Sequence, residues 1–167
     1  IFSPNTAGDW AEDEELGGSS STTTKKSQIL ETLMGACDGR VIQGESASYT
    51  YENVTTSFNT STTWTKITGS GISYKPPTGT KQVVFELIYA YKGPDGGSFE
   101  PLFNTKLKIG TSYVEGQEFC YRESSSGYPE SVVSNIFILD INTSYTESIT
   151  NGKLSSWNTN RDLQVDV

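Results

Sequence analysis

The chain has 167 residues, a length typical of one domain and sufficient to bury a sizeable hydrophobic core. Its 20 acidic and 12 basic residues give a net charge of −8, which opposes non-specific attraction to nucleic acid and to anionic membranes. No run of about 20 apolar residues is present. We therefore expect neither nucleic acid binding nor membrane insertion.

Strand-forming residues dominate the composition. Serine, threonine, tyrosine, asparagine and glycine are abundant, whereas leucine and alanine are scarce. This composition predicts an all-β fold. Together with the pattern of strands and turns described below, the sequence predicts an antiparallel β-sandwich of jelly-roll type with an extended N-terminal arm and one short helix. We divide the chain into an acidic arm with a Ser/Thr/Gly linker at 1–26, a short helix and turn at 27–40, and the β-sandwich at 41–167.

Residues 1–26 have the composition of an arm rather than of a domain, because an acidic run precedes a low-complexity linker. One interpretation is a solvated tail. The other is a peptide that becomes ordered on a partner, with three apolar side chains as anchors: Ile1, Phe2 and Trp10. Because the chain begins at Ile1 rather than at a methionine, we also expect a processed or truncated product.

The segment 27–37 predicts the helix. Ser27 can cap it, and apolar residues recur at three- and four-residue spacing: Ile29, Leu30, Leu33, Met34 and Cys37. A helix of about three turns is marginal alone. We therefore expect it to pack on its own domain or to form the oligomer contact through Ile29, Leu30, Leu33 and Met34.

Residues 62–92 predict three strands, at 62–67, 72–75 and 82–91, separated by Gly69, Gly71 and the turn PPTG. The last of these is too continuously apolar for a surface strand with one buried face. We therefore predict that 82–91 is a central strand covered on both faces. Residues 132–141 have the same character and predict a second such strand.

Shorter strands are predicted along the rest of the chain, at 41–42, 48–51, 102–109, 113–114, 119–121 and 163–167. The Asn151-Gly152 pair is typical of a two-residue hairpin turn and places 144–150 against 154–157. Eight to ten short strands with frequent turns describe a sandwich or a jelly roll.

The sequence lacks the residues that several kinds of catalysis require. The sequence contains no histidine, and its two cysteines, Cys37 and Cys120, make no tetrahedral zinc site. No phosphate-binding or dinucleotide fingerprint is present. We expect no cofactor, no metal and no enzymatic activity. Paired carboxylates are the remaining route, with candidates by residue type alone: Glu86, Glu100, Glu115, Glu118, Glu123, Glu130 and Asp140.

Two further features bear on carbohydrate. Asn53, Asn59 and Asn142 each begin an N-glycosylation acceptor pattern, which also arises by chance in a chain rich in serine, threonine and asparagine. Exposed aromatic residues would offer surfaces for sugar stacking, although in a sandwich most are core or interface. The candidates are Trp64, Tyr74, Tyr89, Tyr91, Tyr121, Tyr128 and Trp157.

The segment 29–91 resembles virion structural proteins of marine tailed phages and large algal DNA viruses. The resemblance rests on ETLMGACDGR, SYTYENVT and TTWTKITGSGISYKPPTGTKQVVFEL. In those proteins a leader similar to ETLxGxCDGR precedes a β-domain with a core similar to TGSxISYxPPxGTKQV. The resemblance implies a capsid- or tail-associated jelly-roll protein of fibres or surface appendages, and it carries over no catalytic residue.

We therefore expect a non-enzymatic structural protein of the virion that contacts other virion proteins and contributes to host attachment, with a host surface glycan as a further partner. A homo-oligomer is expected, and the resemblance favours a trimer. The alternative is a secreted or cell-surface carbohydrate-binding β-sandwich module with an extracellular location. The two alternatives differ in one observable, because a secreted lectin does not co-purify stoichiometrically with a capsid.

Overall fold

A computed structural model describes residues 28–45, 47–57, 59–92, 102–115, 118–120 and 130–167. The strands of this part are β1 Val41–Gln43, β2 Ser48–Thr50, β3 Ile72–Tyr74, β4 Gln82–Lys92, β5 Leu102–Asn104, β6 Lys106–Ile109, β7 Ser112–Val114, β8 Glu118–Cys120, β9 Glu130–Ile141, β10 Lys153–Leu154 and β11 Arg161–Asp166. One 3-10 turn, Ile149–Asn151, is the helical element among these residues. The prediction of an all-β fold is confirmed.

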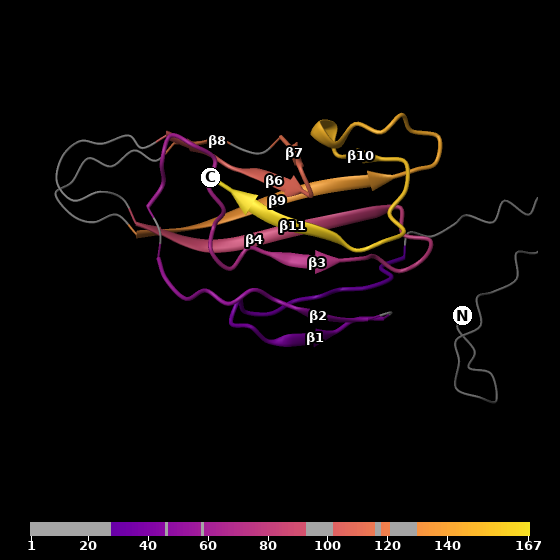
Figure 1. Ribbon diagram of the computed structural model, residues 1–167, viewed down its shortest axis with the longest axis horizontal. Helices are drawn as coiled ribbons and strands as arrows, with labels where there is room; N and C mark the ends of the chain where they lie inside the picture. The colour runs from indigo at the N-terminus through magenta and orange to yellow at the C-terminus, as the bar shows by residue number, and fades with distance from the viewer. Residues whose placement is uncertain (1–27, 46, 58, 93–101, 116–117, 121–129) are drawn as a thin grey trace, which may run out of the picture.

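Two sheets pack face to face, with β11 and β3 in front of β4 and β9 in the view of Figure 1. One has the order β10-β9-β4 and the other β3-β11-β6-β7, while β1-β2 and β5-β8 form separate pairs. β4 and β9 form a long antiparallel ladder, and β10 joins β9 in parallel. These layers confirm the β-sandwich. The jelly-roll arrangement stays a prediction, because these strand orders do not establish it.

The core lies between the two sheets. Side chains alternate along each strand, so one set points inward and the other outward. Both long strands contribute buried side chains to it, and so does the facing sheet. The buried members include Val83, Leu87, Phe137 and Leu139 from β4 and β9, and Leu107, Ile109, Leu163 and Val165 from β6 and β11.

The prediction that β4 and β9 are covered on both faces was wrong. Val83 and Leu87 are buried, but Val84 and Ile88 between them are 57% and 62% exposed. A continuous apolar run shows that both faces avoid polar residues, but it does not show what lies against the second face. Within the described residues that face has no covering layer.

The predicted helix at 27–37 was also wrong. Ser27 lies outside the described residues, and residues 28–36 have no regular secondary structure. The backbone carbonyl of Cys37 instead accepts a hydrogen bond from the Val54 N–H at 2.8 Å. The Glu31 carboxylate accepts one from the Tyr74 hydroxyl at 2.9 Å. Contacts with the sandwich therefore prevail over the weak helix preference of a short segment. The bend at 37–39 agrees with the expected turn.

Two smaller differences concern strands. Residues 62–67 are irregular apart from a bridge between Lys66 and Asp166. The turn at Gly152 is present, but residues 149–151 before it form the 3-10 turn, and one bridge, Ser148 to Lys153, replaces the expected ladder. The described part of the chain has no helix long and apolar enough to cross a membrane.

Candidate functional site

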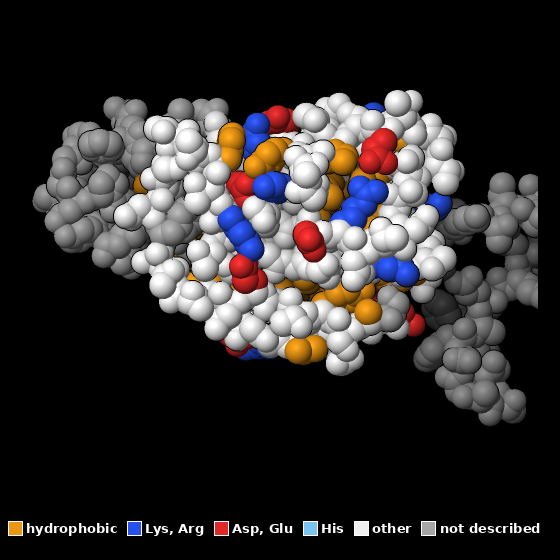
Figure 2. Space-filling view, in the orientation of Figure 1, with side chains coloured by type: hydrophobic (Ala, Val, Ile, Leu, Met, Phe, Trp, Pro, Cys, Tyr) orange, Lys and Arg blue, Asp and Glu red, His pale blue; other side chains and the backbone are white. Residues whose placement is uncertain are grey.

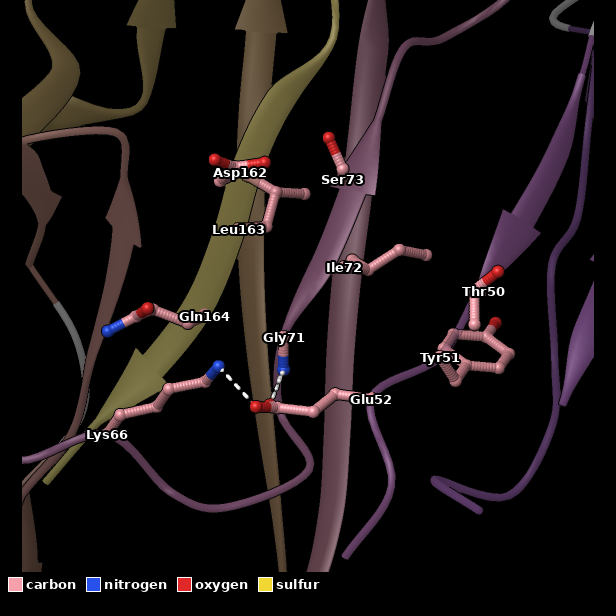
Figure 3. A pocket seen from close by; sticks show the side chains of 10 residues that line it. All are labelled: Thr50, Tyr51, Glu52, Lys66, Gly71, Ile72, Ser73, Asp162, Leu163 and Gln164. Atoms are coloured by element: carbon pink, nitrogen blue, oxygen red, sulfur yellow. Dashed lines mark hydrogen bonds and ion pairs between the residues drawn. The ribbon is translucent and has the colours of Figure 1, made fainter. Parts of the chain in front are cut away.

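One carboxylate anchors the loop that connects Lys66 to β3. An oxygen of Glu52 accepts a hydrogen bond from the Lys66 ammonium at 2.7 Å. Its other oxygen accepts the backbone N–H groups of Gly69 and Gly71 at 3.2 and 3.0 Å. Figure 3 shows the Lys66 and Gly71 bonds converging on this side chain. Glu52 thereby ties three points of the loop to the segment that follows β2.

The glycine at position 71 leaves room for this arrangement. A Cβ atom there would lie 2.7 Å from the Lys66 ammonium and 2.8 Å from the Glu52 carboxylate. Both distances are shorter than real contacts allow, so the ends of these two side chains would have to move away from the loop. The Gly-Ser-Gly sequence at 69–71 is therefore explained by the need to bring backbone N–H groups close to an anion.

An open hollow of about 340 Å³ lies beside this loop, between the segment after β2 and the strands β3 and β11. Its polar lining comes from Glu52, Lys66, Ser73, Asp162 and Gln164. In Figure 3, Ser73 and Asp162 lie toward one end and the Glu52–Lys66 pair toward the other. The hollow is thus a polar surface on the outer side of the four-stranded sheet.

The electrostatics of Glu52 limit what this hollow can do. Burial acts to raise the pKa of its carboxyl, but the hydrogen bonds from Lys66 and the Gly71 N–H outweigh burial and lower the pKa below its usual value. A general acid needs the opposite shift. Glu52 is therefore an ionised structural anchor rather than the general acid of a carboxylate pair.

The outward face of β4 and β9 is the second notable surface. Five aliphatic side chains project from it with exposed fractions between 49% and 75%: Val84, Ile88, Val132, Ile136 and Ile138. The strand register places Val84 opposite Ile138, and Ala90 opposite Val132. We call these residues, with Glu86 and Ser134 between them, the β4–β9 outer face.

A single polar pair interrupts this apolar face. The Ser134 hydroxyl donates a hydrogen bond to the Glu86 carboxylate at 2.7 Å. At one end of the ladder the Gln82 side chain donates to Asp140 at 2.8 Å. Glu86 is therefore exposed on the outer side of β4, and Asp140 lies at the end of the ladder, so the structure does not bring these two candidate carboxylates together in the core.

The four residues of the predicted oligomer contact do not share a helix face. Leu33 packs partly buried against the core, whereas Ile29, Leu30 and Met34 are 82%, 40% and 81% exposed. Because the segment is not helical, these side chains do not form one continuous face. Their role in assembly stays a prediction.

The three candidate glycosylation sites lie on the surface. Asn53, Asn59 and Asn142 are all exposed. The Asn142 side-chain oxygen accepts hydrogen bonds from the backbone and the hydroxyl of Ser144, the third residue of its own acceptor pattern, at 3.0 and 2.9 Å. Exposure is necessary for modification, and modification itself stays a prediction.

Several predicted residues lie outside what the structure describes. They are the anchors Ile1, Phe2 and Trp10, the aromatic residues Tyr121 and Tyr128, the carboxylates Glu100 and Glu123, and the side chains of Glu118, Glu130 and Cys120. Cys37 is a half-buried free thiol whose pKa is raised by burial and by the charges of Asp38 and Glu52. Among the remaining carboxylates, Glu115 accepts a hydrogen bond from the Lys106 ammonium at 3.2 Å.

Reasoning from the sequence missed both Glu52 and the β4–β9 outer face. The only sequence signal for Glu52 was the pair of glycines at 69 and 71. Glycines allow another group to come close to the backbone, but they do not indicate that this group is the Glu52 carboxylate. The signal for the outer face was the set of aliphatic residues at positions 84, 88, 132, 136 and 138, which the sequence analysis interpreted as a second buried face. Within the described residues no group of three or more histidine, cysteine or acidic side chains is placed to hold a metal ion.

In comparisons with known proteins, no family model, no curated protein and no solved structure matches this chain.

Proposed function

We propose that this chain is a non-enzymatic structural protein of a virus particle, and that its copies contact one another through the β4–β9 outer face. The observation that carries the proposal is the exposure of five aliphatic side chains on one side of the long ladder. Soluble monomers rarely present a contiguous apolar surface of this kind, and such surfaces are typical of contacts between proteins.

The energetic argument concerns burial. Covering one aliphatic side chain completely is worth about 1.5–3 kcal/mol, so covering the exposed parts of five contributes several kcal/mol to association. The inward side chains of the same strands already hold the sandwich together. The outward aliphatic residues are therefore not needed for the fold of a single copy.

A second copy of the chain is the occupant that the dimensions fit. The 11 residues of β4 extend the face for roughly 33 Å, and two strands with their side chains are about 15 Å wide. This gives about 500 Å² on one copy and about 1,000 Å² for two equal faces, which reaches the lower bound for a specific interface. An isologous contact uses the same patch on both partners.

The placement in a virus particle rests on the resemblance of residues 29–91 to virion structural proteins. The composition of the chain supports it, because an acidic arm and a polar linker before a β-domain suit attachment to a large assembly. The trimer favoured by that resemblance stays a prediction, and the number of copies follows from a measurement of molar mass.

Light scattering on the full chain tests the contact, with a monomer mass of 18.2 kDa as reference. We expect the wild type to associate and Ile136→Asp to shift it to the monomer. Met34→Asp is the matched control, because Met34 is an equally apolar, 81% exposed residue in the segment first expected to form the contact. Thermal unfolding of both variants confirms that they fold.

Three results would count against this contact. They are a monomeric wild type, an Ile136→Asp variant that associates normally, and dissociation by Met34→Asp alone. The placement in a particle has its own test, which is mass spectrometry of purified virions. A stoichiometric amount of the chain is expected there, and its absence from particles together with recovery from the medium would favour the secreted alternative.

A further inference from the structure

The outer side of the four-stranded sheet carries an aromatic pair that the fold does not bury. The rings of Trp64 and Tyr113 lie with centroids 6.3 Å apart, inclined at 39°. Trp64 is 43% exposed although two neighbours contact it. Basic and acidic side chains are interspersed on this side of the molecule, over β11, β6 and β3, as Figure 2 shows. We call Trp64, Tyr113, Lys106 and Lys108 the aromatic platform.

Trp64 is held rigidly by its neighbours in the chain. The Ser61 hydroxyl donates to the Thr63 carbonyl at 2.9 Å, and the Thr65 hydroxyl donates to the same carbonyl at 3.0 Å. Thr65 also exchanges two backbone hydrogen bonds with Val167, at 3.0 and 2.9 Å. The residues on both sides of Trp64 are therefore fixed, and its exposed ring needs little further ordering to receive a ligand.

Tyr113 is fixed by its hydroxyl. This group donates a hydrogen bond to the Asp166 carboxylate at 2.9 Å, and Asp166 is only 2% exposed. The Gln164 amide donates to the other oxygen of the same carboxylate at 2.6 Å. The buried carboxylate of Asp166 thus accepts hydrogen bonds from two side chains, one of which is Tyr113 of the platform.

Each of the two rings has an ammonium group over it. Lys106 lies 4.7 Å from the centroid of Trp64 and is paired with Glu115 at 3.2 Å. Lys108 lies 5.6 Å from the centroid of Tyr113. Within the described part of the chain no carboxylate lies within ion-pair distance of Lys108.

We infer that the aromatic platform binds an acidic polysaccharide. The apolar face of a pyranose ring stacks on Trp64 and Tyr113, as aromatic rings with one wet side allow. The carboxylate or sulfate of the sugar pairs with Lys108. This binding goes beyond the proposed structural role and rests on different residues, so either proposal can fail without the other.

Calorimetric titration of the full chain tests the inference, with an oligomer of a hexuronic acid as probe and a neutral oligosaccharide of equal length as comparison. A sulfated oligosaccharide forms a third arm, which distinguishes carboxylate from sulfate. We expect an acidic probe to bind at least about tenfold more tightly than the neutral one. Trp64→Ala should weaken that binding about tenfold, and Trp64→Tyr should restore most of it.

Lys108→Gln should remove the preference for the acidic sugar over the neutral one. Its matched control is Lys153→Gln, because Lys153 also lies 5.6 Å from an aromatic centroid, that of Tyr145, at a different place on the surface. Unchanged thermal unfolding excludes a loss of fold. The inference is wrong if neither acidic probe binds, if Trp64→Ala binds normally, or if Lys153→Gln weakens binding as much as Lys108→Gln.

Discussion

The hydroxyl of Ser70 replaces a missing strand partner for Val165. It accepts a hydrogen bond from the Val165 backbone N–H at 3.0 Å and donates one to the Val165 carbonyl at 3.2 Å. The Ile67 backbone N–H also donates to that carbonyl, at 2.8 Å. The edge of β11 therefore stays paired across the loop at 67–71, where β3 no longer runs beside it.

Replacing Ser70 by alanine should lower the free energy of unfolding by about 1–3 kcal/mol, because it leaves the buried Val165 N–H without an acceptor. Ser70 is 3% exposed, so water does not readily take its place. Urea denaturation measures the change. Ser73→Ala, at an exposed position on β3, is the control and should cost less than about 0.5 kcal/mol. Equal losses in both variants would contradict the role of Ser70.

Two glycines with the same backbone conformation should respond differently to alanine. Gly69 and Gly79 have φ of +88° and +93°. A Cβ on Gly79 meets nothing, so Gly79→Ala should cost about 1 kcal/mol from strain alone. A Cβ on Gly69 would overlap the Val54 side chain and crowd Cys37, so Gly69→Ala should cost clearly more. Thermal unfolding of the two variants gives the comparison, and a smaller shift for Gly69→Ala would refute this account of the loop.

Acid should destabilise the protein partly through Glu52. Its pKa in the folded state lies below its usual value of 4.5, so the unfolded state binds more protons around and below that pH. The stability that Glu52 contributes is therefore present above pH 4.5 and is lost as the pH falls through the folded pKa. Glu52→Gln should cost about 1 kcal/mol at pH 7, a modest value because the side chain is partly exposed.

A second carboxylate contributes an acid dependence of the same sign. The pKa of Asp38 is lowered to about 2 by its hydrogen bonds with Arg40, and this contribution is present in both the wild type and Glu52→Gln. Unfolding curves at a series of pH values should show a shallower fall below pH 4.5 for Glu52→Gln than for the wild type. Parallel curves would show that Glu52 does not carry the dependence.

Glu86 should oppose the contact between copies, since a carboxylate in the centre of an apolar interface loses its hydration. Glu86→Gln keeps an acceptor for the Ser134 hydroxyl and removes the charge, so self-association should tighten by about tenfold. Sedimentation equilibrium measures it. Asp162→Asn, an exposed change on the opposite sheet, should leave association unaltered. Weaker association of Glu86→Gln would argue that the outer face is not the contact.

The two phenylalanines of the central ladder should differ in cost. Phe137 is 3% exposed, and its replacement by alanine should lower the free energy of unfolding by about 3–5 kcal/mol. Phe85, its partner across the strands, is only partly buried, so Phe85→Ala should cost about 2 kcal/mol. Chemical denaturation distinguishes them, and a loss below about 1 kcal/mol at Phe137 would exclude its place in the core.

The sequence by itself determined the fold class and the two long strands. β-branched and aromatic residues favour extended backbone wherever they are concentrated, and this preference is local, so 82–91 and 132–141 were identified without a structure. Turn residues such as Gly79 and Gly152 act locally as well, and both mark chain reversals with positive φ.

Tertiary structure alone decided which surfaces these elements present. Whether Val84 and Ile138 are covered depends on the number of layers, which no local pattern encodes. The segment 28–37 has helical spacing, yet the Glu31–Tyr74 and Cys37–Val54 hydrogen bonds tie it to the sandwich in an irregular conformation. Strands distant in sequence bring together Glu52 with Gly71, and Trp64 with Tyr113. Composition and periodicity do not predict such long-range contacts.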